Sequence, residues 1–458
     1  MSCRLGTIAV LALSLSGCTL MYQHRVVRDD LAVYGDDDPD RLESTAKFIE
    51  RAMRGFEKVF PIGGPDVPSP RVVFETDALA RKNVYLPTPR QEGYYLPMLR
   101  LVHLSPQIIE TSSDAPREVE QLESARVVIL HELSHHFLIS VFPESNSKYW
   151  LNEGFACVIE TGRLDEDDRL QIPYFHPWLH RRARVALLGE LGTEGFLREV
   201  RRLIDASWMT FHRQGNKTRN YALSYVSVCY LLEHLEGPLE ERLRLLLSLS
   251  TDELMARLEG LPMAVAQPPA VRLSQLAQSP AHRAWALEQW LELGGAEIEG
   301  LSTELHRSLA SPNEEERVLG SRLAARLVSG DLAETPAARL LAASLLQRLR
   351  DGRRPAEQRA IADEIIPSGF RGAFLAPLID LLESADPDLR VAASGALTRS
   401  RVKPTIARPE FWRSADPGRR RAEIREWRRW IQHYSIRSDE RINASLSTSR
   451  RSSISITQ

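Results

Sequence analysis

The sequence predicts an α+β domain followed by an all-α region of helical repeats. Short aliphatic and β-branched runs bounded by proline lie before residue 105, whereas the apolar pattern from residue 116 onward has mainly helical spacing. The 458 residues allow two or three domains, each with a hydrophobic core. The formal net charge of −2 gives no global field that would attract nucleic acid, so we expect no nucleic-acid partner.

Residues 1 to 17 have the pattern of a targeting segment, which takes no part in the fold. A positive Arg4 precedes an apolar stretch, Leu5 to Leu15, that is too short to span a bilayer. The segment ends in Leu15-Ser16-Gly17-Cys18, which resembles the bacterial lipoprotein signal. The resemblance implies a lipid on Cys18 and, because Thr19 rather than Asp follows, sorting to the outer membrane. An ordinary secretory signal is the alternative, and no other apolar run reaches the roughly 18 residues of a membrane span.

Residues 18 to 265 are expected to form the α+β domain. Its elements are predicted to be a strand around Arg25 to Tyr34, a helix from about Arg41 to Val59, and strands at Arg71 to Glu75 and Leu99 to Leu104, with Gly93-Tyr94-Tyr95 between the last two. They make a small mixed sheet beside a helix, directly before the most informative stretch of the chain.

That stretch is His131-Glu132-Leu133-Ser134-His135, within a run from Pro116 to Ser140 that has helical apolar spacing and no internal glycine or proline. Positions i and i+4 share one face of a helix, so His131 and His135 can aim two ring nitrogens at one zinc ion, roughly 2.0–2.1 Å from each. Glu132 can hold a zinc-bound water and take its proton as the water attacks a carbonyl carbon.

A catalytic zinc site needs a third protein ligand, and Glu153 is the candidate. It lies in a second apolar run, Tyr149 to Ile159, after a segment of turn composition at residues 142 to 147. Two helices joined by so short a loop pack antiparallel, which would return Glu153 to the level of the two histidines.

The two motifs, His131-Glu132-Leu133-Ser134-His135 and Trp150-Leu151-Asn152-Glu153-Gly154-Phe155-Ala156, together resemble the gluzincin metallopeptidases, in particular the peptidase MA-like group related to the aminopeptidase N family. The resemblance implies a zincin-like fold, zinc bound by His131, His135 and Glu153, and Glu132 as the base. In zincin folds a sheet edge lies above the metal cleft, where a substrate chain can add as a strand.

The chain departs from the aminopeptidase N family in two places. It has no Gly-x-Met-Glu-Asn segment, which in that family captures the amino terminus of the substrate, and the spacing between His135 and Glu153 is one residue shorter. Both departures weigh against aminopeptidase activity and leave the metal site intact.

Three further residues are candidates for the site. Glu160, seven positions after Glu153, can orient a zinc-bound histidine from behind, and the alternative is a solvated surface side chain. Tyr221, and as second choice Tyr225, lie in a helical stretch similar to a tyrosine-rich helix of peptidase MA-like proteins, where a phenol would stabilise an oxyanion. The alternative is that both tyrosines are core aromatics.

Other polar groups are expected to be structural. The acidic run at residues 165 to 168 is interpreted as a solvated loop, and His176 and His180, on either side of Pro177, are expected at the surface. Cys157 and Cys229 can form a disulfide in an oxidising compartment, the alternative being two buried free thiols.

Residues 262 to 280, with a central Pro268-Pro269, are predicted to be a linker or domain edge, and residues 280 to 435 a HEAT-like helical repeat domain. Phe374 to Leu382 followed by Asp386 to Leu397 resembles one HEAT repeat, Leu305 to Leu327 a weaker copy, and Arg339 to Leu349 part of a third. A plain helical domain is the alternative. The chain is expected to end in an amphipathic helix at Glu423 to Tyr434, with Trp427 and Trp430 on one face, and a disordered tail at 436 to 458.

These observations predict a lipid-anchored zinc metallopeptidase of the bacterial cell envelope, with a peptide or protein substrate and a protein partner on the helical repeats. A scaffold lipoprotein whose metal-site domain is structural or inactive is the main alternative, and a zinc hydrolase of a non-peptide bond is the second. A structural zinc site has no need of a general base beside its ligands, so Glu132 favours the enzyme.

Overall fold

A computed structural model describes residues 22, 24–28, 30–35, 39–74, 93–104, 118–212, 216–294, 298–330, 333, 335–366, 369–400 and 408–432. The chain forms two compact units, Met1–Arg272 and Leu273–Gln458, and each is described by itself. The predicted signal segment with Cys18 and the predicted tail lie outside the described residues. None of the helices in the described ranges is both long and apolar enough to cross a membrane.

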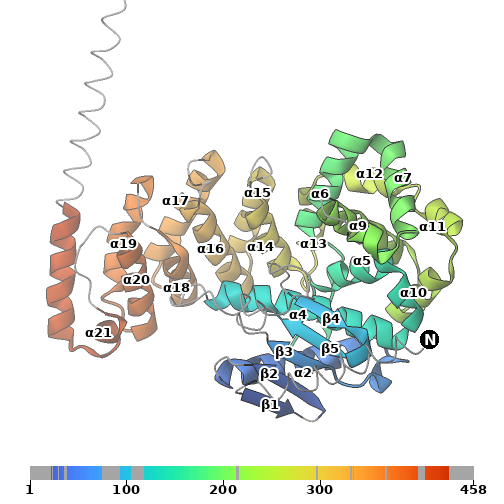
Figure 1. Cartoon of the computed structure of the whole chain (residues 1–458). Coiled ribbons are helices and arrows are strands. Elements are labelled where there is room, and N and C mark those ends of the chain that lie inside the picture. Colours follow the sequence, from blue (N-terminus) through green and yellow to red (C-terminus); the bar gives the residue numbers. More distant parts are fainter. Residues whose placement is uncertain are drawn as a thin grey trace, which may run out of the picture. The chain divides into compact units, whose positions relative to one another are not determined.

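One five-stranded mixed sheet lies in the first unit, in the order β1-β2-β3-β5-β4 (Figure 1). Strands β1 (His24–Arg28) and β2 (Leu31–Gly35) are antiparallel, whereas β2, β3 (Arg71–Phe74) and β5 (Leu101–Leu104) run parallel. The last strand, β4 (Gly93–Leu96), is antiparallel to β5 and follows it at the edge. The single strand predicted for residues 25 to 34 is wrong, because the chain turns at Asp30, a residue type that favours turns, and forms a hairpin.

Helices α2 (Pro39–Val59), α4 (Glu118–Val141) and α5 (Tyr149–Ile159) meet in an aromatic cluster. Phe56 stacks on Phe137 with ring centres 4.6 Å apart, and Phe60 meets Phe155 edge to face at 6.1 Å. All four side chains are fully buried. Aromatic pairs of this kind are worth about 0.5–1.5 kcal/mol each beyond their buried area, so the cluster fixes how α4 and α5 lie against each other.

The loop between α4 and α5 is the 3₁₀ helix η6 (Pro143–Ser147), and the two predicted helices begin and end close to the predicted residues. Nine of the eleven residues of α5 are buried, because the helix is covered by α4 on one side and α9 (Lys217–His234) on another. The remaining helices of the unit are α6 (Pro177–Val185), the π-helix η7 (Ala186–Leu191), α7 (Gly192–Ile204), α8 (Trp208–Phe211), α10 (Leu239–Ser248), α11 (Thr251–Arg257) and α12 (Leu261–Ala266), and the unit boundary falls within α13 (Pro269–Leu276).

Gly154 allows α5 and α9 to cross closely. A Cβ atom at this position would lie 2.7 Å from the backbone oxygen of Ser224 and 2.7 Å from Cγ2 of Val228, closer than real Cβ atoms approach. The two free cysteines, Cys157 on α5 and Cys229 on α9, are both buried, so the disulfide considered above is absent and the thiol alternative holds.

The acidic loop is more than a solvated turn. It connects the short strands β6 (Arg163–Leu164) and β7 (Leu170–Gln171), and Asp165 Oδ1 accepts hydrogen bonds from the backbone N–H groups of residues 167 and 169. Asp168 forms ion pairs with Arg51 at 2.5 Å and Arg54 at 2.9 Å, both on α2. The sequence prediction missed these contacts because their partners lie more than a hundred positions earlier in the chain.

The second unit is a succession of helices that pack side by side (Figure 1). Its helices are α14 (Arg283–Leu293), α15 (Ile298–Leu309), α16 (Glu314–Ser329), α17 (Pro336–Arg350), α18 (Pro355–Glu364), α19 (Leu375–Leu381), α20 (Pro387–Arg399), α21 (Pro409–Ser414) and a further helical stretch at 417–432. Residues 262 to 280 were predicted to be a linker or a domain edge. The boundary between the two units falls inside this range, as a domain edge requires, but the range is no linker, because α12 and α13 occupy most of it.

Several of these helices begin at a residue whose side chain accepts hydrogen bonds from the first backbone N–H groups of the helix. Asp386 accepts hydrogen bonds from the backbone N–H groups of Asp388 and Leu389 at the start of α20, and Asn313 does the same for Glu315 at the start of α16. In the last helical stretch Trp427 is buried and Trp430 is 37 % exposed, so Trp430 lies at the edge of the apolar face rather than within it.

Candidate metal centre

Helix α4 presents His131 and His135 one turn apart, and α5 returns Glu153 to the same level. Nε2 of His131 and Nε2 of His135 each lie 3.6 Å from Oε2 of Glu153. The three potential ligand atoms all lie within 4.8 Å of one another. The structure therefore brings together the three ligands that were predicted from the sequence.

These three residues fit a tetrahedral metal ion. Ligand atoms at 2.0–2.1 Å from zinc lie about 3.4 Å apart in tetrahedral geometry, close to the two separations of 3.6 Å. Glu153 Oε2 is buried and has no hydrogen-bond partner among the described residues. Because a buried carboxylate oxygen without a partner is costly, a cation bound between this oxygen and the two rings would remove that cost.

Each histidine is held from behind through its other ring nitrogen. His131 Nδ1 donates a hydrogen bond to Oε2 of Glu160 at 2.6 Å, and His135 Nδ1 donates to Oδ1 of Asn152 at 2.8 Å. Since carboxylate and amide oxygens accept here, both Nδ1 atoms carry the proton, and both Nε2 atoms keep a free lone pair toward Glu153. Glu160 is thus beside His131 and nearly buried rather than a solvated surface residue.

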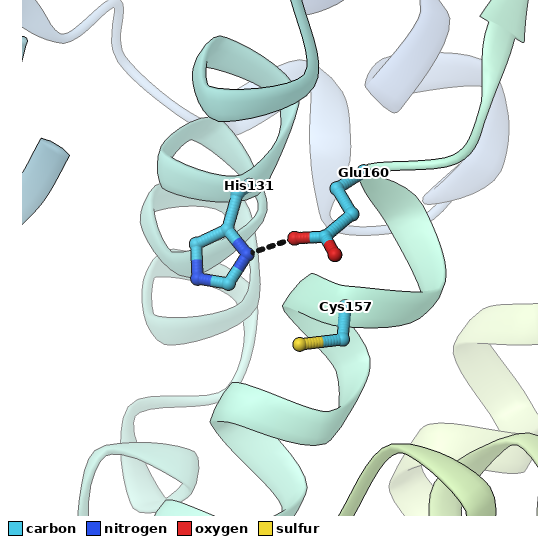
Figure 2. Close-up of side chains that lie close together, drawn as sticks. All are labelled: His131, Cys157 and Glu160. Carbon is cyan, nitrogen blue, oxygen red and sulfur yellow. Dashed lines mark hydrogen bonds and ion pairs between the residues drawn. The ribbon is translucent and has the colours of Figure 1, made fainter. Parts of the chain in front are cut away.

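A second group of possible ligands, His131, Cys157 and Glu160, overlaps the first. Figure 2 shows Cys157 and Glu160 reaching His131 from the same helix, with Glu160 on the ring nitrogen. The contact of 2.6 Å is a hydrogen bond, too short for two ligands that surround one zinc ion. Burial also raises the pKa of the Cys157 thiol to about 12, which disfavours the thiolate form that a metal ion binds. The first group is therefore the better metal site.

Glu160 also contacts a second histidine, His176. Its other oxygen, Oε1, lies 3.0 Å from Nε2 of His176, and the backbone N–H of His176 donates to the hydroxyl of Tyr225 at 2.6 Å. The prediction that His176 lies at the surface is wrong, because His176 precedes α6 and is drawn toward Glu160. Tyr225 is buried, and its hydroxyl oxygen accepts this backbone hydrogen bond. His180 is also partly buried, with Nε2 3.1 Å from the backbone oxygen of Gln267.

Burial and neighbouring charges give the carboxyl groups of Glu132 and Glu153 very different pKa values. Burial raises the pKa of Glu132 to about 8, and the neighbouring His131 and Lys217 side chains oppose this rise. Burial also acts on Glu153, but His135 and His131 outweigh it and lower the pKa of Glu153 to about 2. One carboxyl group is therefore suited to exchange a proton near neutral pH, and the other to remain a charged ligand.

The site opens into a cavity of about 470 Å³. Its described lining includes His131, Glu132, Glu160, His176 and Tyr221, together with Gly93, Val127, Val128, Cys157, Trp178, Leu179, Lys217 and Thr218. Tyr221, the preferred tyrosine of the sequence analysis, thus shares the cavity with Glu132. Burial, and then the negative charge of Glu153, keep the pKa of Tyr221 well above its usual value, so its hydroxyl remains a hydrogen-bond donor.

Sequence reasoning missed four residues of this region. Asn152 precedes Glu153 in the Asn-Glu-Gly motif, so its position was a usable signal. His212, which follows α8, has Nε2 3.6 Å from Oε1 of Glu153, whereas His131 and His135 approach the other oxygen, Oε2. Nothing local to His212, His176 or Lys217 in the sequence indicates that the fold brings them to the site.

Comparison of the chain with models of known protein families, with curated proteins and with solved structures finds no match. The proposals below therefore depend on the geometry of the site and on the motifs.

Proposed function

We propose that this chain is a zinc-dependent peptidase with a zincin-like catalytic domain. The observation that supports it best is the convergence of His131, His135 and Glu153, with Glu132 in the adjoining cavity. Two histidines and a carboxylate leave one position of a tetrahedral ion open, which is the ligand set of a catalytic rather than a closed structural zinc site.

When bound, zinc would lower the pKa of a water molecule and polarise the substrate carbonyl. Glu132 accepts the proton of the attacking water and returns it to the leaving amine, a role that its pKa of about 8 supports. The hydroxyl of Tyr221 donates to the oxygen that becomes negative on the carbonyl. Glu160 and Asn152 keep the two histidine rings in their orientation.

The sheet edge supports a peptide as substrate. Strand β4 is the last strand of the sheet, and its outer edge has no partner strand among the residues described. Gly93, at its start, lies so close to α4 that a Cβ atom there would be 3.0 Å from Oε1 of Glu132. A peptide that paired with β4 would therefore pass beside Glu132, and its backbone would supply the hydrogen bonds.

We also propose that the second unit is a HEAT-like repeat domain and that the protein is anchored to the cell envelope through Cys18. The helix pair α19 and α20, with Asp386 as cap and Ala392 and Ala393 buried, supports the first proposal. The partner-binding face of the repeat domain is a proposal that rests on the sequence alone. The lipid on Cys18 rests on the sequence alone as well.

Metal analysis and hydrolysis together test the function. We expect one zinc per chain in protein never exposed to chelator, and turnover of some members of a mixed peptide library. Glu132→Gln should keep its zinc, because the amide replaces no ligand, while hydrolysis falls by about 10² or more. Glu166→Gln, at an exposed position of the acidic loop, is the matched control. No hydrolysis by the parent would favour the scaffold alternative, whereas equal hydrolysis by Glu132→Gln would remove Glu132 from the mechanism.

A further inference from the structure

The charged groups of the cavity limit which substrates it can accept. Two carboxylates line it, Glu132 and Glu160. Glu160 is already paired with His131 and His176, and Glu132 is the proposed base. No other carboxylate is among the described lining residues, so nothing there is left to bind the free ammonium group of a peptide amino terminus.

Lys217, by contrast, brings a positive charge to the cavity. It is the one lysine or arginine among the described lining residues of the cavity. Its ammonium group lies 5.6 Å from the ring centre of Tyr221, and within the described ranges no carboxylate forms an ion pair with it. A cation that faces a cavity without an ion-pair partner is suited to bind an anion that arrives with the substrate.

The N-terminus of α9, like Lys217, favours a negative charge nearby. Lys217 and Thr218 are the first two residues of the helix, and the preceding Asn216 places no side-chain oxygen on its N–H groups. Unsatisfied N–H groups and the helix dipole favour a negative charge at such an end. The helix end and the lysine therefore act in the same direction, at one wall of the cavity.

The distance from the reacting bond suits a neighbouring residue of the substrate. Lys217 and Tyr221 are four positions apart on α9, about 6 Å along its axis. If Tyr221 holds the scissile carbonyl, a carboxylate one residue further along an extended peptide lies about 3.3–3.6 Å beyond it. The Lys217 ammonium lies 5.6 Å from the centre of the Tyr221 ring, a separation of the same scale.

We propose that Lys217 binds a carboxylate of the substrate next to the scissile bond, so that the site selects peptides with a negative charge at that position. The charge is supplied either by the C-terminal carboxylate or by the side chain of an Asp or Glu residue. This inference rests on the proposed peptidase function, because it uses the same cavity and the same substrate.

Binding to a variant that cannot turn over tests the inference without relying on activity. We would load Glu132→Gln with zinc and measure, by fluorescence anisotropy, the Kd of labelled peptides that differ only in a C-terminal acid or amide. A second pair differs only in an internal Glu or Gln. The acid member of at least one pair should bind about tenfold more tightly, as expected for a charge-assisted hydrogen bond, and the pair that shows it identifies the source of the charge.

The variant Glu132→Gln/Lys217→Met should lose this difference while keeping its zinc, and Glu132→Gln/Lys217→Arg should retain part of it. Lys47→Met, on the exposed side of α2, is the control in the same background. Equal affinity for acid and amide in both pairs, absence of binding, or a preference that survives Lys217→Met would overturn the inference. If the parent hydrolyses peptides without such a preference, only the inference fails. If the preference is present but the parent hydrolyses nothing, the proposed peptidase function fails and carboxylate binding stands.

Discussion

Glu160 holds His131 through its Nδ1 atom at 2.6 Å, and so decides which nitrogen of the ring faces Glu153. The carboxylate is nearly buried, and hydrogen bonds from His131 and His176 outweigh the effect of burial and lower its pKa to about 2. It is therefore charged at any pH at which the protein would work. A charged acceptor fixes the tautomer of the ring and makes Nε2 a stronger ligand.

Glu160→Gln should weaken the metal site. The amide still fits, but it is neutral, so the orienting hydrogen bond loses its charge assistance. We expect zinc affinity to fall by about 10- to 100-fold, measured by competition with a chromogenic chelator. Glu166→Gln should bind zinc as the parent does. An unchanged affinity in Glu160→Gln would mean that the contact with His131 has no role in metal binding.

Gly154→Ala should destabilise the first unit. The added methyl group would lie 2.7 Å from the backbone oxygen of Ser224, and a backbone atom cannot move aside as a flexible side chain can. We expect urea denaturation to show a loss of about 1–3 kcal/mol, the usual range for overpacking, with weaker zinc binding because Glu153 moves with α5.

The matched control for this substitution is Gly189→Ala, since a Cβ atom there would meet no other atom within 4 Å. It should leave stability unchanged or slightly raised, because alanine is the better helix former. A Gly154→Ala variant as stable as Gly189→Ala would contradict the close crossing of α5 and α9.

The sequence was sufficient for the part of the site that depends on local geometry. Spacing of four on a helix placed His131 and His135 on one face, and a short turn followed by a second apolar run returned Glu153 to them. The second apolar run, Tyr149 to Ile159, coincides with α5. The small mixed sheet before these helices and the helical C-terminal region were also predicted, the coarse architecture that the structure describes.

Contacts between distant segments could not be predicted in this way. His212 meets Glu153, and His176 meets Glu160, only because α6, α8 and α9 fold back over α5. Likewise, the need for glycine at position 154 becomes clear only when the backbone of Ser224 is known to face it. At residues 262 to 280 the prolines suggested a linker, but the start of a helix tolerates proline, and α12 and α13 both use it there.

The two tyrosines of α9 should respond differently to loss of their hydroxyl groups. Tyr221→Phe should keep zinc and stability but lose roughly 10²-fold in kcat, if its hydroxyl meets the oxyanion. Tyr225→Phe should instead cost about 1–3 kcal/mol in the free energy of unfolding, because the buried N–H of His176 loses its acceptor. Steady-state kinetics and urea denaturation of both variants separate the two roles. A Tyr221→Phe variant with the kcat of the parent would remove this residue from the mechanism.

If the proposed function is right, metal removal should abolish hydrolysis without unfolding the first unit. The helices that hold the ligands are packed independently of any ion, since Phe56, Phe60, Phe137 and Phe155 are buried between α2, α4 and α5. A ligand bound at about 1,000 times its Kd contributes only about 4 kcal/mol, so the metal-free protein should unfold at a lower temperature but still cooperatively.

Circular dichroism before and after treatment with a chelator measures this directly. The helical signal at 25 °C should remain, activity should disappear, and added zinc should restore activity and the melting temperature together. His135→Ala should resemble the chelated parent and should not respond to zinc, because two ligands seldom hold a catalytic ion. Loss of the helical signal on chelation would show instead that the ion holds the fold together, as in structural zinc sites, and would favour the scaffold over the peptidase.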